Sequence, residues 1–297
     1  MSQVCVKILS MKSHLLIILF LLFGITCFVI PNDAAMNDGS QGPEPLGWRS
    51  GEESIIQMKS EHLDIHFGVE TTKVKVAFTF ISHKKSGPAL QKLGFPDASR
   101  SYQEGDVSGP IKNLITRVNG KEVKSELVEG HYHYKINEDG SEEYEKVEEG
   151  ADESERHAWY VIDVEFPVGE EVIVEREYSC PSGGSTNWDS FFIYETRTGG
   201  AWKGKIEKLT ADVTFDKTVR PDLVMLEPEE GWEWSDDKSK VSLTWGPFEP
   251  RTEENRQWIS ITTLNIPLLE QIHEDAPDLV PTVEGYVENW KKNVLNN

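Results

Sequence analysis

The chain has 297 residues, of which 38% are hydrophobic and 27% charged, so it is long and apolar enough to form a substantial core. The 51 acidic and 30 basic residues give a net charge of −21, which opposes binding to nucleic acid or to an anionic membrane surface. We therefore exclude nucleic-acid binding and expect an acidic, well-solvated surface. Binding of a cation or of a basic partner is the alternative interpretation of this charge.

The N-terminal segment is typical of an exported protein. Two lysines precede an uncharged apolar run over residues 15–30, and the small residues Ala34 and Ala35 follow it, which is the order of a secretory signal. We predict that residues 1–35 form a signal peptide and that the mature protein lies outside the cytoplasm, in the periplasm, in the envelope or secreted. An uncleaved membrane anchor over residues 15–30 is the alternative, and it is the one membrane contact that we expect.

A segment of Gly, Pro, Ser, Asn, Asp and Gln with few apolar residues predicts a linker over residues 36–53. The folded part then begins near residue 54, with predicted strands at 55–58 and 62–67. In the second of these strands, alternation places three apolar side chains toward a core and His62, Asp64 and His66 toward water. A further strand at 74–80, which follows a short link, predicts an antiparallel pair.

The middle of the chain contains a strong hairpin signal and a long charge run. Asn119-Gly120 lies between predicted strands at 111–118 and 122–127, and both turn residues tolerate the positive φ of a type I′ turn. Residues 138–155 are strongly acidic, so we predict a solvated loop there.

Strand patterns continue almost to the end of the chain and set the fold class. Turn residues separate the predicted strands, which lie at residues 157–166, 171–178, 206–215, 223–226, 241–245 and 258–264. We predict a mainly β protein, an antiparallel β-sandwich over residues 54–265 that is either one large sandwich or two packed halves at 54–180 and 190–265.

The last segment, residues 266–297, differs and predicts a helical tail. Its apolar residues Val283, Tyr286, Val287 and Trp290 recur at helical spacing, and Thr282 is placed to cap the start. We therefore expect a C-terminal amphipathic helix.

Several short segments also resemble a known family. The sequence is similar to a family of secreted bacterial proteins called domain of unknown function 4424, at residues 55–66, 74–80, 171–178, in L-G-F-P-D (93–97) and in T-G-G-A-W-K-G (198–204). Its first part also resembles the domain shared by vault proteins and inter-α-trypsin inhibitors, including the hairpin at 115–123. The resemblance implies an extracytoplasmic β-sandwich without an established activity, and it supplies no catalytic residue.

No catalytic motif or cofactor-binding motif is present, so we predict a protein that is not an enzyme and needs no cofactor. Cys180 follows a strand, where an inert thiol is the usual case. His131 and His133 would lie on one strand face at a spacing that suits a transition metal, and His62 and His66 form a looser pair. Because spacing identifies no third ligand, we favour structural histidines over a metal site.

Aromatic residues provide the binding candidates. The segment Ser190–Glu207 concentrates aromatics around Gly199-Gly200, and we interpret it as a packing corner in which Tyr194, Trp202 and Lys203 are the residues to inspect for exposure. Trp232 and Trp234 alternate onto one strand face, as a sugar-stacking platform requires, although Trp is also a core residue of β domains.

These patterns lead to one functional hypothesis with two alternatives. We expect an exported, non-catalytic β-sandwich module of the envelope or exterior that binds a protein or has a structural role. A glycan-binding accessory domain is the second hypothesis, and a metal-dependent or hydrolytic enzyme is the third.

Overall fold

The structure is a computed structural model. It describes residues 44–46, 55–97, 111–136, 142–148, 155–249, 252–253 and 258–296, which belong to one compact unit. The predictions for the segment 1–35, and for most of the linker at 36–53, lie outside the described residues. Within that linker, Glu44–Leu46 forms the short strand β1.

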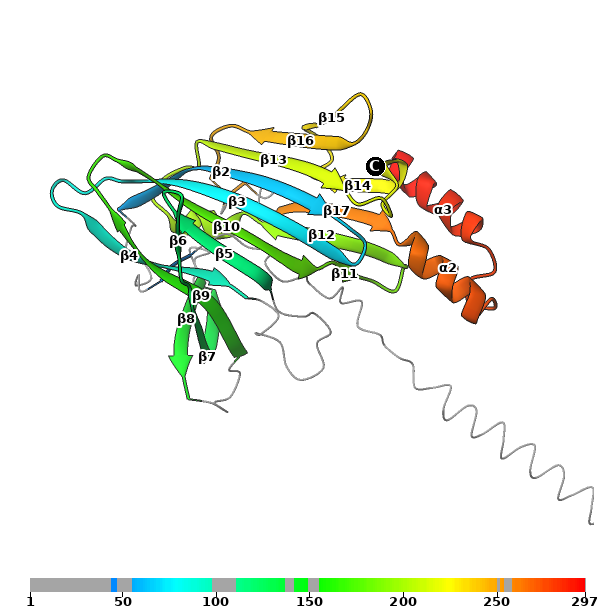
Figure 1. The fold of residues 1–297 in the computed structure, drawn as a ribbon, viewed down its shortest axis with the longest axis horizontal. Helices are drawn as coiled ribbons and strands as arrows, with labels where there is room; N and C mark the ends of the chain where they lie inside the picture. The colour runs from blue at the N-terminus through cyan, green and yellow to red at the C-terminus, as the bar shows by residue number, and fades with distance from the viewer. Residues whose placement is uncertain are drawn as a thin grey trace, which may run out of the picture. The chain divides into compact units, whose positions relative to one another are not determined.

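The described strands form three sheets (Figure 1). The largest has eight described strands, in the order β15 (Trp232–Trp234), β16 (Lys240–Trp245), β13 (Lys208–Phe215), β2 (Ile56–Phe67), β3 (Thr71–Ser82), β10 (Glu171–Pro181), β5 (Lys112–Val118) and β6 (Lys121–Val123). The second has five, in the order β1 (Glu44–Leu46), β4 (Ala89–Pro96), β9 (Glu155–Phe166), β7 (Glu126–Ile136) and β8 (Glu142–Val147). The third has four, in the order β11 (Gly183–Gly184), β12 (Asp189–Glu195), β17 (Trp258–Leu264) and β14 (Val224–Glu227).

One face of the eight-stranded sheet packs on both smaller sheets around a continuous core. The ring of Phe80 on β3 lies 5.8 Å from that of Phe166 on β9, and Tyr178 on β10 lies 5.4 Å from Phe95 on β4. Ile259 and Ile261 of β17 join the same core from the four-stranded sheet. The predicted fold class, a mainly β protein with a sandwich of antiparallel sheets and a C-terminal helix, is therefore confirmed.

Strand β2 replaces the two separate strands that the sequence predicted at 55–58 and 62–67. A β-bulge between Met58 and Ser60 lets the chain stay paired with β3 in the predicted antiparallel sense. Before the bulge the even-numbered Ile56 and Met58 face the core, and after it the odd-numbered residues do, starting with Glu61. One extra residue thus reverses which side chains are buried.

The Asn119-Gly120 hairpin is confirmed, because both residues have positive φ (50° and 75°) and β5 pairs with β6. The predicted strand at 122–127 is instead split. Its first part is β6 in the eight-stranded sheet, and the chain then crosses to the five-stranded sheet, where β7 begins at Glu126.

The acidic run at 138–155 was predicted to be a loop, and this prediction was wrong over Glu142–Val147, which forms β8. Among the described strands, β8 lies at the edge of its sheet and pairs with β7. Pairing through the backbone needs no apolar side chain, and charged residues are common on edge strands because they discourage pairing with other chains.

Two helices follow the last strand, α2 (Ile266–Asp275) and α3 (Val283–Asn296). The predicted cap is confirmed, because the Thr282 hydroxyl accepts a hydrogen bond from the Gly285 amide at 3.1 Å. A small second core holds the helices, and in it the Trp290 indole donates to the Leu223 carbonyl at 2.7 Å. No helix among the described residues is long and apolar enough to cross a membrane. Two 3₁₀ helices, Arg197–Ala201 and Pro221–Leu223, lie in the connections.

A buried carboxyl group joins two of the sheets. Glu61 on β2 is 3% exposed and accepts a short hydrogen bond from the hydroxyl of Tyr194 on β12, which is fully buried. Burial raises the pKa of Glu61 to about 7, because water no longer stabilises the charged form, and it raises the pKa of Tyr194 as well.

A buried guanidinium joins the eight-stranded sheet to the five-stranded one. Arg176 on β10 donates to the Tyr160 carbonyl of β9 and to the hydroxyl of Ser125, both at 3.3 Å, and its charge lies 4.9 Å from the centre of the Phe95 ring. Ser125 belongs to the segment where the chain crosses between sheets. Burial lowers the pKa of Arg176 to about 9.

We predict that Tyr194→Phe lowers the free energy of unfolding by about 1–3 kcal/mol, because it leaves the buried carboxyl of Glu61 without its donor. Urea denaturation measures the change. Tyr286→Phe is the matched control, since that hydroxyl bonds an exposed backbone carbonyl, and we expect a loss below about 0.5 kcal/mol. Equal losses in both variants would contradict a special role for the buried pair.

We also predict a pH-dependent stability that comes from Glu61. The folded protein holds this proton more tightly than the unfolded chain does, so its contribution is full below pH 4.5 and is lost as the pH rises through 7. At about 1.4 kcal/mol per pKa unit, the loss is about 3 kcal/mol. The free energies of unfolding of the wild type and of Glu61→Gln, measured by urea denaturation between pH 4 and pH 8, should diverge by this amount. Parallel curves would show that Glu61 does not titrate in this range.

Candidate functional site

The outer face of the eight-stranded sheet carries a polar surface that two neighbouring strands build. On β2, Leu63, Ile65 and Phe67 are buried, so the alternation predicted from the sequence is confirmed and His62, Asp64 and His66 face outward. Strand β13 runs parallel beside β2, with Thr210 next to His62, Asp212 next to Asp64 and Thr214 next to His66. The pairing therefore assembles imidazole, carboxylate and hydroxyl groups from residues about 150 positions apart.

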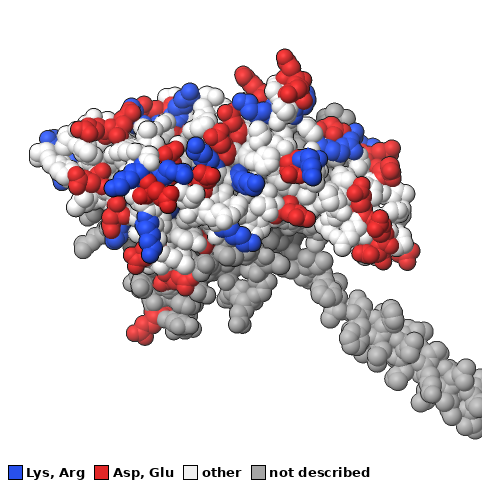
Figure 2. Space-filling model, in the orientation of Figure 1, with Lys and Arg blue, Asp and Glu red and all other residues white. Residues whose placement is uncertain are grey.

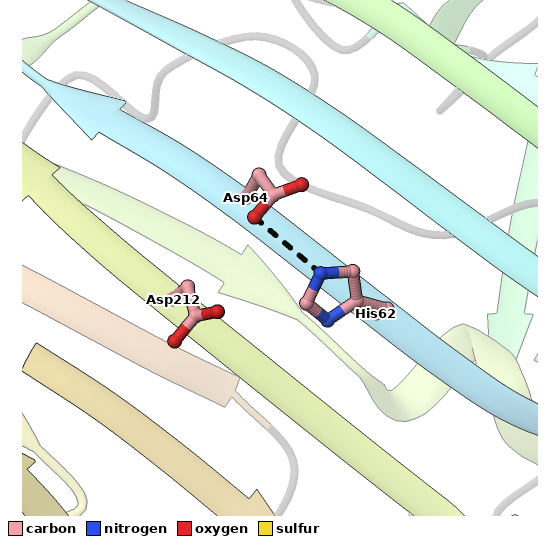
Figure 3. Close-up of side chains that lie close together, drawn as sticks. All are labelled: His62, Asp64 and Asp212. Atoms are coloured by element: carbon pink, nitrogen blue, oxygen red, sulfur yellow. Dashed lines mark ion pairs between the residues drawn. The ribbon is translucent and has the colours of Figure 1, made fainter.

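His62, Asp64 and Asp212 form a cluster on this surface, and Figure 3 shows the imidazole directed between the two carboxylates. Each residue offers one nitrogen or oxygen atom as a possible metal ligand, and these three atoms lie within 4.8 Å of one another. The Nε2 atom of His62 lies 3.4 Å from an oxygen of Asp64, and its Nδ1 atom lies 2.7 Å from the Thr210 hydroxyl. The hydroxyl thus fixes the ring so that Nε2 faces the Asp64 carboxylate.

Two donors on the next strand hold Asp212. The Ser242 hydroxyl and the Lys240 ammonium on β16 both donate to its Oδ1 atom, the ammonium at 3.2 Å. These contacts, first of all the Ser242 hydrogen bond, lower the pKa of Asp212. Asp212 is therefore an ionised, positioned carboxylate at neutral pH.

A shallow groove of about 630 Å³ extends from this cluster across the sheet. The charged side chains that line the groove are both acidic and basic, and they are Asp64, Lys73, Lys75, Glu177, Asp212 and Lys240. Figure 2 shows this outer face, on which basic and acidic groups are interspersed. The groove can therefore offer ionic and hydrogen-bonding contacts to a polar ligand.

An irregularity in strand pairing shapes one side of the groove. The pairing of β10 with β5 shifts between Glu177 and Ser179, and Asn113 of β5 has a positive φ of 57°. The Asn113 amide donates to the Ser179 hydroxyl at 3.3 Å. β-Bulges of this kind commonly redirect side chains next to functional sites.

The structure places the predicted corner residues in the core. Tyr194 is fully buried against Glu61, and Trp202 is 4% exposed, with its ring 4.6 Å from that of Phe80. Lys203 is half-buried, and its backbone amide donates to the Ile56 carbonyl at 2.8 Å. Neither aromatic ring is therefore available at the surface.

Trp232 and Trp234 are half-buried and pack on the edge of the same core. Their cross-strand partners are the buried Leu243 and Val241, so both rings lie on the core side of β15. Trp234 stacks on Phe215 with 5.5 Å between ring centres.

The predicted metal candidates His131 and His133 lie in β7, opposite β8. Their side chains lie outside the part of the chain that the structure describes. Cys180 is buried at the end of β10, where its thiol lies 3.8 Å from the Thr72 carbonyl.

The sequence alone predicts two of the three members of the outer cluster, because alternation places His62 and Asp64 on one outward strand face. It does not connect Asp212 with them. The available signal was the matching alternation of H-x-D-x-H at 62–66 and T-x-D-x-T at 210–214. Either pattern alone predicts a solvated strand face, and the parallel pairing that joins them has no local signature.

We predict that Trp202→Ala acts through stability alone. Removing this buried ring should lower the free energy of unfolding by about 3–5 kcal/mol. Trp258→Ala is the control, since Trp258 is 45% exposed, and we expect a loss of no more than about 1 kcal/mol. Denaturant unfolding of both variants checks this, and a small loss for Trp202→Ala would mean that its ring does not support the core.

No family model and no curated protein matches the sequence. Among solved structures, a proposed nutrient-binding protein from Legionella pneumophila has a TM-score of 0.57 at 16% identity, over 80% of this chain and 75% of its own. An M1 zinc metallopeptidase from Deinococcus radiodurans has a TM-score of 0.34 at 9% identity, over 71% of this chain and 42% of its own. Leukotriene A4 hydrolase from Saccharomyces cerevisiae has a TM-score of 0.35 at 8% identity, over 72% and 31%. The likeness to the Legionella protein shows a shared fold.

Proposed function

We propose that the chain is an exported, non-catalytic binding module that holds a polar ligand in the groove on the outer face of its eight-stranded sheet. The observation that carries this proposal is the groove itself, a volume of about 630 Å³ lined by charged side chains of both signs. Its volume falls within the usual range for small-molecule sites. Export is part of the proposal and is supported by the N-terminal sequence. Kinship with the secreted family that the chain resembles is also part of it and is supported by the similar segments between residues 55 and 204.

The rigidity of the groove supports binding as its role. Its charged side chains come from neighbouring strands whose backbones are fixed by sheet hydrogen bonds, so little ordering is needed when a ligand binds. Lys75 lies at the centre, opposite Asp64 of β2 on one side and Glu177 of β10 on the other. Such a surface suits a ligand that carries both charges or several hydroxyl groups.

The chemistry of the lining supports a non-catalytic role. The hydroxyl of Ser179 in the groove contacts the Lys112 carbonyl and the Asn113 amide, and neither group can act as a base. Glu61 and Arg176, whose pKa values burial shifts to about 7 and about 9, point into the core and away from this face. The fold shared with the proposed nutrient-binding protein is consistent with a small polar ligand.

The test is a thermal-shift screen of the full chain against amino acids, short peptides, dicarboxylates and soluble sugars, with calorimetry for any ligand that raises the Tm. We expect Lys75→Gln to weaken binding by about 10–100-fold, because it removes one charged hydrogen bond. Lys121→Gln is the control, because Lys121 lies in the hairpin strand β6 and does not line the groove, and it should retain the wild-type affinity.

Four outcomes would overturn the proposal. The first is that no compound raises the Tm, and the second is that a ligand binds Lys75→Gln as tightly as the wild type, which would place its site elsewhere. Loss of sugar binding in Trp232→Ala or Trp234→Ala alone would favour the glycan hypothesis. Turnover of a bound compound would favour an enzyme.

A further inference from the structure

We propose that His62, Asp64 and Asp212 bind a divalent transition-metal cation such as Zn²⁺ on the outer face of the eight-stranded sheet. This inference goes beyond the polar ligand of the groove, because it concerns a cation and can be tested without knowing that ligand. Two of the three residues, Asp64 and Asp212, also line the groove.

The chemistry of the donor set selects the class of metal. An imidazole nitrogen and two carboxylate oxygens are ordinary ligands of zinc and of its first-row neighbours. Calcium and magnesium prefer sets made of oxygen alone. The histidine in the centre of this cluster therefore favours a transition metal over either of them.

The separations of the donor atoms fit such a site with little movement. Ligands at about 2.0–2.1 Å from a tetrahedral metal lie about 3.3–3.4 Å from one another. The Nε2 atom of His62 and the oxygen of Asp64 are already 3.4 Å apart. The three donors lie within 4.8 Å of one another, so rotation of the Asp64 side chain, which is 52% exposed, and small movements of the other two ligands close the remaining gap.

Neighbouring side chains orient the ligands toward the metal position. The Thr210 hydroxyl occupies Nδ1 of His62, which leaves Nε2 as the ligand atom. Ser242 and Lys240 both bind Oδ1 of Asp212, and they leave its Oδ2 atom for a cation. Outer contacts that fix a ring and a carboxylate in this way are typical of metal sites and affect affinity strongly.

Charge balance also favours the proposal. Two carboxylates neutralise a divalent ion. The ammonium of Lys240 keeps its ion pair with Oδ1 of Asp212, on the side of the carboxylate away from the proposed cation. The side chains of His62 and Asp64 are 45% and 52% exposed. Three protein ligands at an open surface leave a position for water or for a ligand from solution, as in zinc sites that are not purely structural.

The same strand supplies a matched control. His66 faces outward two residues beyond Asp64, and its Nδ1 atom contacts the Thr214 hydroxyl at 3.1 Å, as His62 contacts Thr210. Two residues further along the chain, where His62 has Asp64, His66 has Gly68, so the pair of carboxylates is not repeated around it. His66→Ala therefore removes an equivalent imidazole and keeps all three proposed ligands.

The experiment is calorimetric titration of ZnCl₂ into the full chain, purified without a metal-binding tag and stripped with EDTA. We expect one Zn²⁺ per chain, with CaCl₂ and MgCl₂ giving no comparable heat. His62→Gln and Asp212→Asn should each weaken binding by about tenfold or more, at least as much as the loss of an outer contact. Substitution with Co²⁺ should give the visible absorption of a low-coordinate site, which the same variants should lose.

The controls separate this site from the alternatives. His66→Ala and the double variant His131→Ala/His133→Ala should keep the wild-type affinity, and unchanged circular dichroism and Tm should show that every variant folds. Should a variant unfold, Asp64→Asn gives an independent test. Absence of zinc binding, zinc binding unchanged in His62→Gln and Asp212→Asn, or its loss in the His131/His133 variant would each overturn the proposal. Each of these results is independent of whether a polar ligand of the groove is found.

Discussion

The hydrogen bond between Glu61 and Tyr194 is the contact on which the arrangement of the sheets depends. It places a carboxyl group at the buried interface of the eight-stranded and four-stranded sheets. A polar group without a partner there would destabilise the protein by more free energy than most single apolar contacts contribute. Arg176 performs the same task toward the five-stranded sheet. Apolar packing alone would accept many relative positions of three sheets, whereas two buried polar side chains, each hydrogen-bonded to a partner on a different small sheet, keep these bonds in one arrangement.

The bulge between Met58 and Ser60 connects this interior contact with the outer cluster. Because side chains alternate along a strand, the extra residue that turns Glu61 inward also turns His62 and Asp64 outward. Without it, the odd-numbered residues of β2 would face the solvent and the histidines would face the core. The inter-sheet anchor and the candidate site thus follow from one local feature, and moving the bulge would disturb both.

The features that the sequence predicts are those that depend on neighbouring residues. The alternation in β2 and β3, the Asn119-Gly120 turn and the Thr282 cap are local, and all three are found in the structure. The bulge, the crossing between sheets before Glu126 and the parallel pairing of β2 with β13 depend on contacts far apart in the chain. Strand β8 was missed because its composition is that of a loop, and pairing with β7 overrides it. The concentration of aromatic residues in Ser190–Glu207 indicates binding candidates on the wrong side of the eight-stranded sheet. Trp202 packs in the core, whereas the polar cluster lies on the outer face.

The parallel pairing of β2 and β13 also links the candidate site to the stability of the whole protein. Strand β13 is held between β2 and β16, so the cluster forms only when β13 pairs with β2, a contact between residues about 150 positions apart. A ligand or cation that bridges the two strands binds the folded state and has no comparable site in the unfolded chain. Its binding free energy is therefore added to the stability of the sandwich. The coupling also acts in the other direction. Loss of the buried Glu61 contact would lower the stability of the fold that holds His62 and Asp64 in place on the opposite face of β2.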